Sequence, residues 1–80
     1  MREYLISSNT MTFGARIKQL RIAKGITQHQ LSADSGIPFY TIVALEYNRT
    51  KVPLVTTVIK LADYFKISIP DLITGVSFFN

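Results

Sequence analysis

Residues 27–46, with the sequence TQHQLSADSGIPFYTIVALE, constrain the fold more than any other stretch of the chain. Thr27 can cap a helix with its hydroxyl, and Gln30, three residues later, can return to the freed amide at the helix start. The helical pattern continues to Gly36, a residue type that tolerates the left-handed backbone of a tight helix exit. The first half of this stretch therefore predicts a helix with a defined start and a defined end.

A second helix is predicted to begin directly after that exit. Pro38 suits a first helical turn, and Ile42 and Leu45, three residues apart, lie on one helical face. Two short helices joined by a turn of about three or four residues that contains glycine form a helix-turn-helix. One side of the second helix would then be available to enter a DNA major groove.

Further helices are predicted on both sides of this motif. A preceding helix would start at the Thr12 cap and end at Gly25, with these residues facing the core at spacings of three and four: Phe13, Ile17, Leu20 and Ala23. A following helix should begin near residues 54–56 and present to the core Val55, Val58, Ile59, Ala62 and Phe65. A short final helix would be capped by Ser68 and stopped at Gly75.

Several of these residues together resemble the Cro/phage-repressor (XRE-type) helix-turn-helix family over about residues 13–73. The resemblance is carried by Gln28, Leu31, Gly36, Ile42 and Glu46, with Arg21 upstream and Pro53, Leu61 and Ala62 downstream. It implies an all-α fold, a compact five-helix repressor-like domain with the helix-turn-helix in helices 2 and 3. We expect an N-terminal arm at 1–11, the DNA-binding domain at 12–75 and an apolar C-terminal tail at 76–80.

The resemblance also implies where the chain departs from its relatives and which residues form an ion pair. Asn48 and Lys66 stand where relatives more often carry glycine. Asn tolerates left-handed backbone, so that conformation is expected at Asn48 at little cost. If Lys66 also adopts it, about 1 kcal/mol of strain is stored there. In relatives, the residues matching Arg21 and Glu46 form a largely buried ion pair between the first helix and the end of the recognition helix. The alternative is that either residue is exposed and unpaired.

DNA contacts are implied at two sets of residues. In relatives, the position of Gln28 meets a DNA phosphate at a helix N-terminus, and the loop carrying Tyr47, Arg49 and Lys51 follows the sugar-phosphate backbone. Base reading should fall to the outward side of the second motif helix, at Phe39, Tyr40, Thr41, Val43 and Ala44. These base-reading residues lack the Gln, Arg or Asn common in relatives, so thymine methyl contacts and A·T-rich steps are favoured.

The apolar character of that helix leaves an alternative function open. Exposed Phe, Tyr and Val together are also typical of a surface that binds another protein. The first hypothesis is a sequence-specific, repressor-type transcriptional regulator that binds a palindromic operator in double-stranded DNA as a homodimer. The second is a protein-interaction module that uses the apolar face of the recognition helix.

The homodimer is expected to form through the last helix and the tail. Relatives often dimerise there, and an apolar terminus is better covered than left in water. The predicted interface residues are Leu72, Ile73, Val76, Phe78 and Phe79.

Composition fits a single small domain and disfavours catalysis. The chain has 80 residues, a formal charge of +4, a pI near 9.7 and no cysteine, which favours a polyanionic partner and excludes disulfides and thiolate metal sites. The five carboxylates lie at scattered positions without an acid/base or metal-ligand spacing, and the glycines at 14, 25, 36 and 75 are expected to be helix punctuation. We therefore predict no enzyme activity, no catalytic or metal-binding residue and no cofactor.

His29, the one histidine of the sequence, is expected to be a solvated polar residue, with a phosphate contact as the alternative. Met1 to Glu3 are followed by no long apolar run, and no stretch approaches the roughly 18 apolar residues of a membrane span. We therefore expect neither a signal peptide nor a membrane anchor, and predict a cytoplasmic protein.

Overall fold

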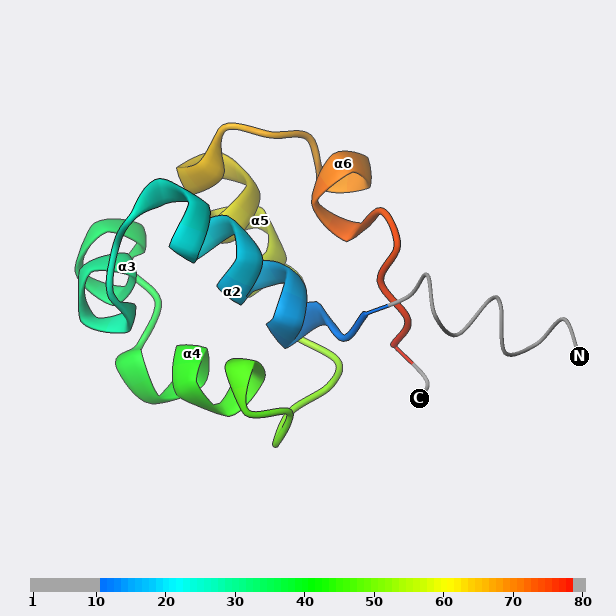
Figure 1. Ribbon diagram of the computed structural model, residues 1–80, viewed down its shortest axis with the longest axis horizontal. Helices are drawn as coiled ribbons and strands as arrows, with labels where there is room; N and C mark the ends of the chain where they lie inside the picture. The colour runs from blue at the N-terminus through cyan, green and yellow to red at the C-terminus, as the bar shows by residue number, and fades with distance from the viewer. Residues whose placement is uncertain (1–10, 79–80) are drawn as a thin grey trace, which may run out of the picture.

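The computed structural model describes residues 11–78, which form an all-helical domain with five helices in that span. The helices are α2 (Phe13–Lys24), α3 (Gln28–Ser35), α4 (Phe39–Glu46), α5 (Val55–Phe65) and α6 (Ile69–Ile73). In Figure 1, α2 crosses the middle of the molecule, α4 runs beneath it and α3 closes one end. The core between them consists of Phe13, Ile17, Leu31, Ile37, Ile42, Leu45, Leu61, Ala62 and Leu72. The predicted fold class is confirmed.

The helix starts agree with the caps predicted from the sequence. Thr12, Thr27 and Ser68 each accept a hydrogen bond from the amide three residues later, at 3.1, 3.0 and 3.1 Å. The Gln30 side chain does not return to the helix start as the capping-box pattern predicted; it donates instead to Asp34 Oδ1 at 2.8 Å. Each cap satisfies one of the amides that a helix start leaves without a partner inside the helix.

Left-handed backbone follows each of the four helices α2, α3, α4 and α5. Gly25 and Gly36 have φ of 75° and 79°, while Asn48 and Lys66 have φ of 61° and 57°. Asn tolerates this region, but Lys66 carries a long side chain there, so about 1 kcal/mol of backbone strain is stored at the end of α5. Both departures from glycine therefore keep the backbone shape that glycine would have allowed.

The buried face of α5 agrees only in part with the predicted one: Ala62 is buried and Val58 and Phe65 pack against the core as expected, but Val55 and Ile59 do not. Val55 and Ile59 are 73% and 43% exposed, whereas Thr57 and Leu61 are buried. Helix α5 has one broad apolar face, and spacing alone does not decide which edge of that face turns inward. Packing against α3 and α6 selects the edge through Leu61. Ala23, also predicted to face the core, is exposed near the end of α2.

Gly14 is not the helix punctuation that the sequence suggested, because it lies inside α2 at its crossing with α4. A Cβ atom built on Gly14 would lie 1.7 Å from the carbonyl oxygen of Leu45 and 2.5 Å from its carbonyl carbon. No side chain fits at that distance from backbone. Gly14 therefore sets how closely α2 approaches the end of α4.

The predicted boundaries at Met11 and Val76 fall inside the folded body. Met11 and Val76 form a parallel β-bridge, in which the Met11 amide donates to Gly75 O and the Ser77 amide donates to Met11 O, both at 2.9 Å. The Phe78 ring lies with its centroid 5.9 Å from that of Phe13. The rest of the predicted arm, residues 1–10, and the last two residues, 79–80, lie outside the described residues.

Candidate nucleic-acid interface

The turn between α3 and α4 is fixed by hydrogen bonds from its own residues. The Gly36 amide donates to Ser32 O at 3.0 Å, and the Ser32 hydroxyl donates to Ile37 O at 2.6 Å. The Ile37 amide in turn donates to Ser35 Oγ at 3.2 Å, and the Ile37 side chain is buried in the core. These contacts set the direction in which α4 leaves the turn, so α3 and α4 form the predicted helix-turn-helix (Figure 1).

Helix α4 is divided into an inward and an outward side, as the sequence predicted. Ile42 and Leu45 are each 1% exposed, whereas Tyr40, which lies nearer the turn, is 75% exposed. The other predicted base-reading residues are half-buried: Phe39, Thr41, Val43 and Ala44. None of the five is sealed in the interior, so all of them contribute some surface to this side of the domain.

Phe39 is paired with a residue of the preceding helix. Its ring lies almost parallel to the imidazole of His29, with an interplanar angle of 5° and 3.9 Å between centroids. The sequence predicted a solvated His29. It could not predict the stack, because a contact between the first turns of two helices depends on how α3 and α4 cross. The stack joins the two N-termini of the motif at the surface.

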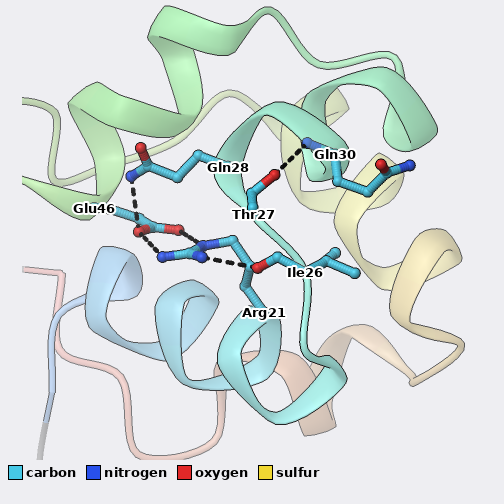
Figure 2. A network of polar contacts seen from close by, with 6 residues as sticks. All are labelled: Arg21, Ile26, Thr27, Gln28, Gln30 and Glu46. Carbon is cyan, nitrogen blue, oxygen red and sulfur yellow. Dashed lines mark hydrogen bonds and ion pairs between the residues drawn. The ribbon is translucent and has the colours of Figure 1, made fainter.

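A polar network holds the end of α4 to α2 and α3 (Figure 2). Arg21 donates from Nε to Glu46 Oε2 at 2.7 Å and from Nη2 to Glu46 Oε1 at 2.9 Å, and its Nη1 donates to Ile26 O at 2.9 Å. Gln28 Nε2 donates to the same Oε1 at 3.0 Å. The ion pair predicted from the resemblance is thus present as a two-pronged contact, and Gln28 is joined to it.

This network is largely removed from water. The side chains of Arg21 and Glu46 are 12% and 2% exposed. The hydrogen bond to Glu46 raises the pKa of the Arg21 guanidinium above its ordinary value, against the opposing effect of burial. The Arg21 guanidinium therefore stays charged, and its two bonds to Glu46 fix the orientation of the last turn of α4 relative to α2.

The loop after α4 is held against the end of that helix. The amides of Arg49 and Thr50 donate to Ala44 O at 2.8 and 3.3 Å, and the Asn48 amide donates to Leu45 O at 3.1 Å. Tyr47 is 65% exposed, and the side chains of Arg49 and Lys51 are also exposed. The two predicted phosphate-contacting cations therefore lie on the segment that directly continues α4.

A surface hollow brings one further cation to this side of the domain. Its lining comes from α2, the start of α3 and the end of α4, and includes Lys18, Gln28 and Tyr47. Lys18 lies in the middle of α2, where the sequence gives no reason to separate it from other solvated lysines. Only the folding of α2 across the motif places it beside two predicted phosphate contacts.

The predicted dimer residues are spread over different environments. Leu72 is fully buried within one chain, so it offers no surface to a second subunit, and this part of the prediction is wrong. The carbonyls at the end of α6 are bound by the guanidinium of Arg16, which donates to Leu72 O and Asp71 O at 3.0 and 2.9 Å. Ile73, Val76 and Phe78 are half-buried, while Phe79 lies outside the described residues.

An apolar groove adjoins these residues. Its lining is Pro53, Val55, Val58, Ile59, Ile69 and Phe78.

Across residues 11–78, no three His, Cys, Asp or Glu side chains gather as metal ligands, and no helix there is both long and apolar enough to cross a membrane.

Comparison with known proteins agrees with this geometry. A family model described as "Helix-turn-helix domain" matches residues 14–77, which is most of the chain. No curated protein and no solved structure matches this chain. The family match, together with the arrangement of α3 and α4, supports a DNA-binding regulator. The chain belongs to the helix-turn-helix domain family.

Proposed function

We propose that this protein is a sequence-specific, repressor-type transcriptional regulator of the Cro/phage-repressor kind. It binds a palindromic operator in double-stranded DNA as a homodimer. It acts by occupying a promoter or by recruiting another factor to it, without catalysis and without a cofactor.

One observation carries the proposal: the outward side of α4 is continuous with a cationic loop. Tyr40 is 75% exposed on α4, and the exposed Arg49 and Lys51 follow on the loop that is hydrogen-bonded to its end. A helix entering the major groove needs cations at its border, because the phosphates on both sides of the groove are negatively charged. This arrangement meets that requirement with residues adjacent in the chain.

The base-reading residues favour a particular kind of site. Val43 and Ala44 can contact thymine methyl groups, and the Tyr40 and Thr41 hydroxyls can each donate one hydrogen bond to a base edge. None of them forms the paired hydrogen bonds with which Arg or Gln selects a purine. We therefore expect A·T-rich steps at the contacted positions and a contribution from the shape of the DNA.

The proposed docking includes phosphate contacts. The amide group of Gln28 carries two N–H donors, so one can bind Glu46 as observed while the second meets a phosphate. Tyr47, Arg49 and Lys51 would contact the backbone at the far end of α4, and Lys18 would join them from α2. Because Gln28 is hydrogen-bonded to the carboxylate of Glu46, a phosphate held by Gln28 also fixes the orientation of α4.

The homodimer is proposed on the apolar surface around the chain's last described residues. Ile73, Val76 and Phe78 each keep part of their surface exposed, and Phe78 also lines the neighbouring groove with Ile59 and Ile69. A two-fold dimer would bring two copies of α4 to one side of the DNA, about 34 Å apart, which is one turn of the double helix.

Selection from a random duplex library at moderate salt, followed by sequencing of the retained DNA, tests the proposal. Recovery of an inverted repeat with half-sites one helical turn apart is the expected result. Retention that disappears as salt is raised, with no enriched sequence, would reduce the protein to a general polyanion binder and contradict the proposal.

A second candidate function follows from a hollow beside α4. It is lined by Tyr40, Ala44, Val52 and Leu54, and the side chains of Val52 and Leu54 are 61% and 73% exposed. Exposed apolar side chains gathered around a hollow are typical of a protein-binding surface. Under this hypothesis, Leu54→Ser abolishes capture of a polypeptide partner, whereas under the first it leaves the selected DNA sequence unchanged.

A further inference from the structure

The stacked pair of His29 and Phe39 lies where the motif is expected to enter DNA. Phe39 is the first residue of α4, and His29 lies in the first turn of α3. In helix-turn-helix proteins, the N-terminal residues of the second helix contact base edges. The His29 ring, stacked on Phe39 with 3.9 Å between centroids, therefore lies at the helix end that is expected to contact the bases.

Stacking leaves the hydrogen-bonding edge of the imidazole available. With its planes 5° apart, the pair occupies one face of the His29 ring, while the two nitrogens lie on the ring edge. His29 is exposed, whereas Phe39 is half-buried. The half-buried Phe39 thus serves as a platform that restricts the rotation of an exposed nitrogen donor.

This donor adds a chemistry that α4 itself lacks. The five predicted base-reading residues include two hydroxyl groups and no side-chain nitrogen. A ring N–H of histidine can donate to a phosphate oxygen or to the O6 or N7 of guanine, all of which are acceptors. Because its ring is already held by stacking, little side-chain freedom is lost when the contact forms.

We propose that His29 is a DNA-contacting residue, which donates from its imidazole edge to an acceptor on the duplex while stacked on Phe39. The proposal rests on the DNA-binding function proposed above. It assigns one hydrogen bond of the recognition surface to α3 rather than α4.

The test compares binding of His29→Phe and the wild type to the duplex selected by the wild-type protein and to an unrelated duplex. His29→Phe keeps an aromatic ring to stack on Phe39 but removes the N–H donor. We expect about a three- to tenfold loss of affinity, the usual effect of one hydrogen bond. Gln30→Ala is the matched control, since Gln30 lies in the same helical turn but its side chain binds Asp34.

The pattern of loss identifies the acceptor. An equal loss on both duplexes assigns a phosphate, and a loss confined to the selected duplex assigns a base edge; both support the proposal. Wild-type affinity of His29→Phe for the selected duplex overturns the inference and leaves the proposed function standing. Failure of the wild type to select any sequence overturns both.

A measurement on the wild-type protein covers the case in which a variant does not fold. Because the sequence has one histidine, the imidazole ring protons give assignable NMR signals. They should be shifted upfield by the Phe39 ring, return toward ordinary values in Phe39→Leu, and show nuclear Overhauser contacts to DNA protons in the complex. Ring protons unaffected by the selected duplex would contradict the contact.

Discussion

The carboxylate of Glu46 accepts two hydrogen bonds from Arg21, a residue 25 positions earlier in the chain, and a third from Gln28. A single side chain at the end of α4 thus joins that helix to α2 and α3 (Figure 2). The Glu46 side chain is almost completely buried, so its carboxylate depends on these donors in place of water.

Removal of one partner from this pair should destabilise the fold. Arg21→Ala leaves the Glu46 carboxylate buried without its main partner, which costs roughly 3–5 kcal/mol of unfolding free energy. In a domain of this size, that loss lowers Tm by more than about 10 °C. DNA affinity should fall mainly because less protein is folded. Differential scanning calorimetry measures the effect, and an unchanged Tm would refute it.

Two other variants separate charge from geometry at this site. Arg21→Lys keeps the positive charge but carries a single side-chain nitrogen, which cannot reproduce the two parallel N–H bonds to both oxygens of Glu46, so its Tm should lie between those of Arg21→Ala and the wild type. Lys18→Ala changes an exposed cation on the same helix and should alter stability by less than about 0.5 kcal/mol.

Gly14→Ala should be among the most damaging single-methyl additions in the chain. The new Cβ would meet the Leu45 carbonyl oxygen at 1.7 Å, and this carbonyl, at the end of α4, is held in place by a hydrogen bond from the Asn48 amide. We expect a loss of about 3 kcal/mol, at the upper end of typical overpacking costs, measured by urea unfolding. Gly25→Ala is the comparison, because its Cβ meets nothing within 4 Å and its cost of about 1–2 kcal/mol comes from φ of 75° alone. Equal costs at both sites would contradict the close crossing of α2 and α4.

Tyr64 should make stability depend on alkaline pH. Desolvation, and then a 3.0 Å hydrogen bond from its hydroxyl to Asp34 Oδ2, raise the pKa of Tyr64 above its ordinary value of 10.0. A raised pKa means that the folded state holds the proton more tightly than the unfolded state does. The contribution to stability is therefore complete below about pH 10 and is lost as pH rises through the folded-state pKa.

Spectrophotometric titration at 295 nm checks this assignment. Tyr64→Phe should delete a late-titrating phenol from the wild-type curve, and Asp34→Ala should move that phenol to lower pH by removing its acceptor. If Tyr64→Phe instead removes a phenol that titrates at lower pH than the others, the upward direction of the Tyr64 pKa shift is contradicted.

The proposed dimer should depend on the exposed part of Ile73. A charge at this position would be desolvated in a two-fold contact, so Ile73→Glu should weaken association at least about tenfold. Sedimentation velocity over a concentration series measures the change. Ile22→Glu provides a control, because Ile22 is 58% exposed on α2, outside the predicted interface. A wild-type protein that stays monomeric at high micromolar concentration would count against the dimer.

Phosphate contacts and base contacts should respond differently to substitution. Lys51→Ala should weaken binding to all duplexes about equally and reduce the slope of log K against log salt by about 1. Ala44→Ser should instead change discrimination at one position of the selected site. Quantitative binding to a panel of single-position variants of that site distinguishes the two, and a sequence-dependent effect of Lys51→Ala would move this residue to base reading.

The sequence by itself determined the local elements and the motif. Thr12, Thr27 and Ser68 cap helices because a side-chain oxygen next to free amides needs no distant partner. Gly25 and Gly36 end helices for a similarly local reason, and the three-residue spacing of Ile42 and Leu45 identified the inward side of α4. The Arg21–Glu46 pair was available only through the resemblance to a family, since nothing local joins residues that far apart.

Tertiary structure decided every feature that depends on how two helices meet. It selected Leu61 over Val55 as a core residue of α5, closed Leu72 inside one chain, and made Gly14 a contact point with Leu45. It also stacked His29 on Phe39 and brought Lys18 beside Gln28. Capping and periodicity act over three or four residues, whereas these contacts depend on helix crossing angles that only the packed core sets.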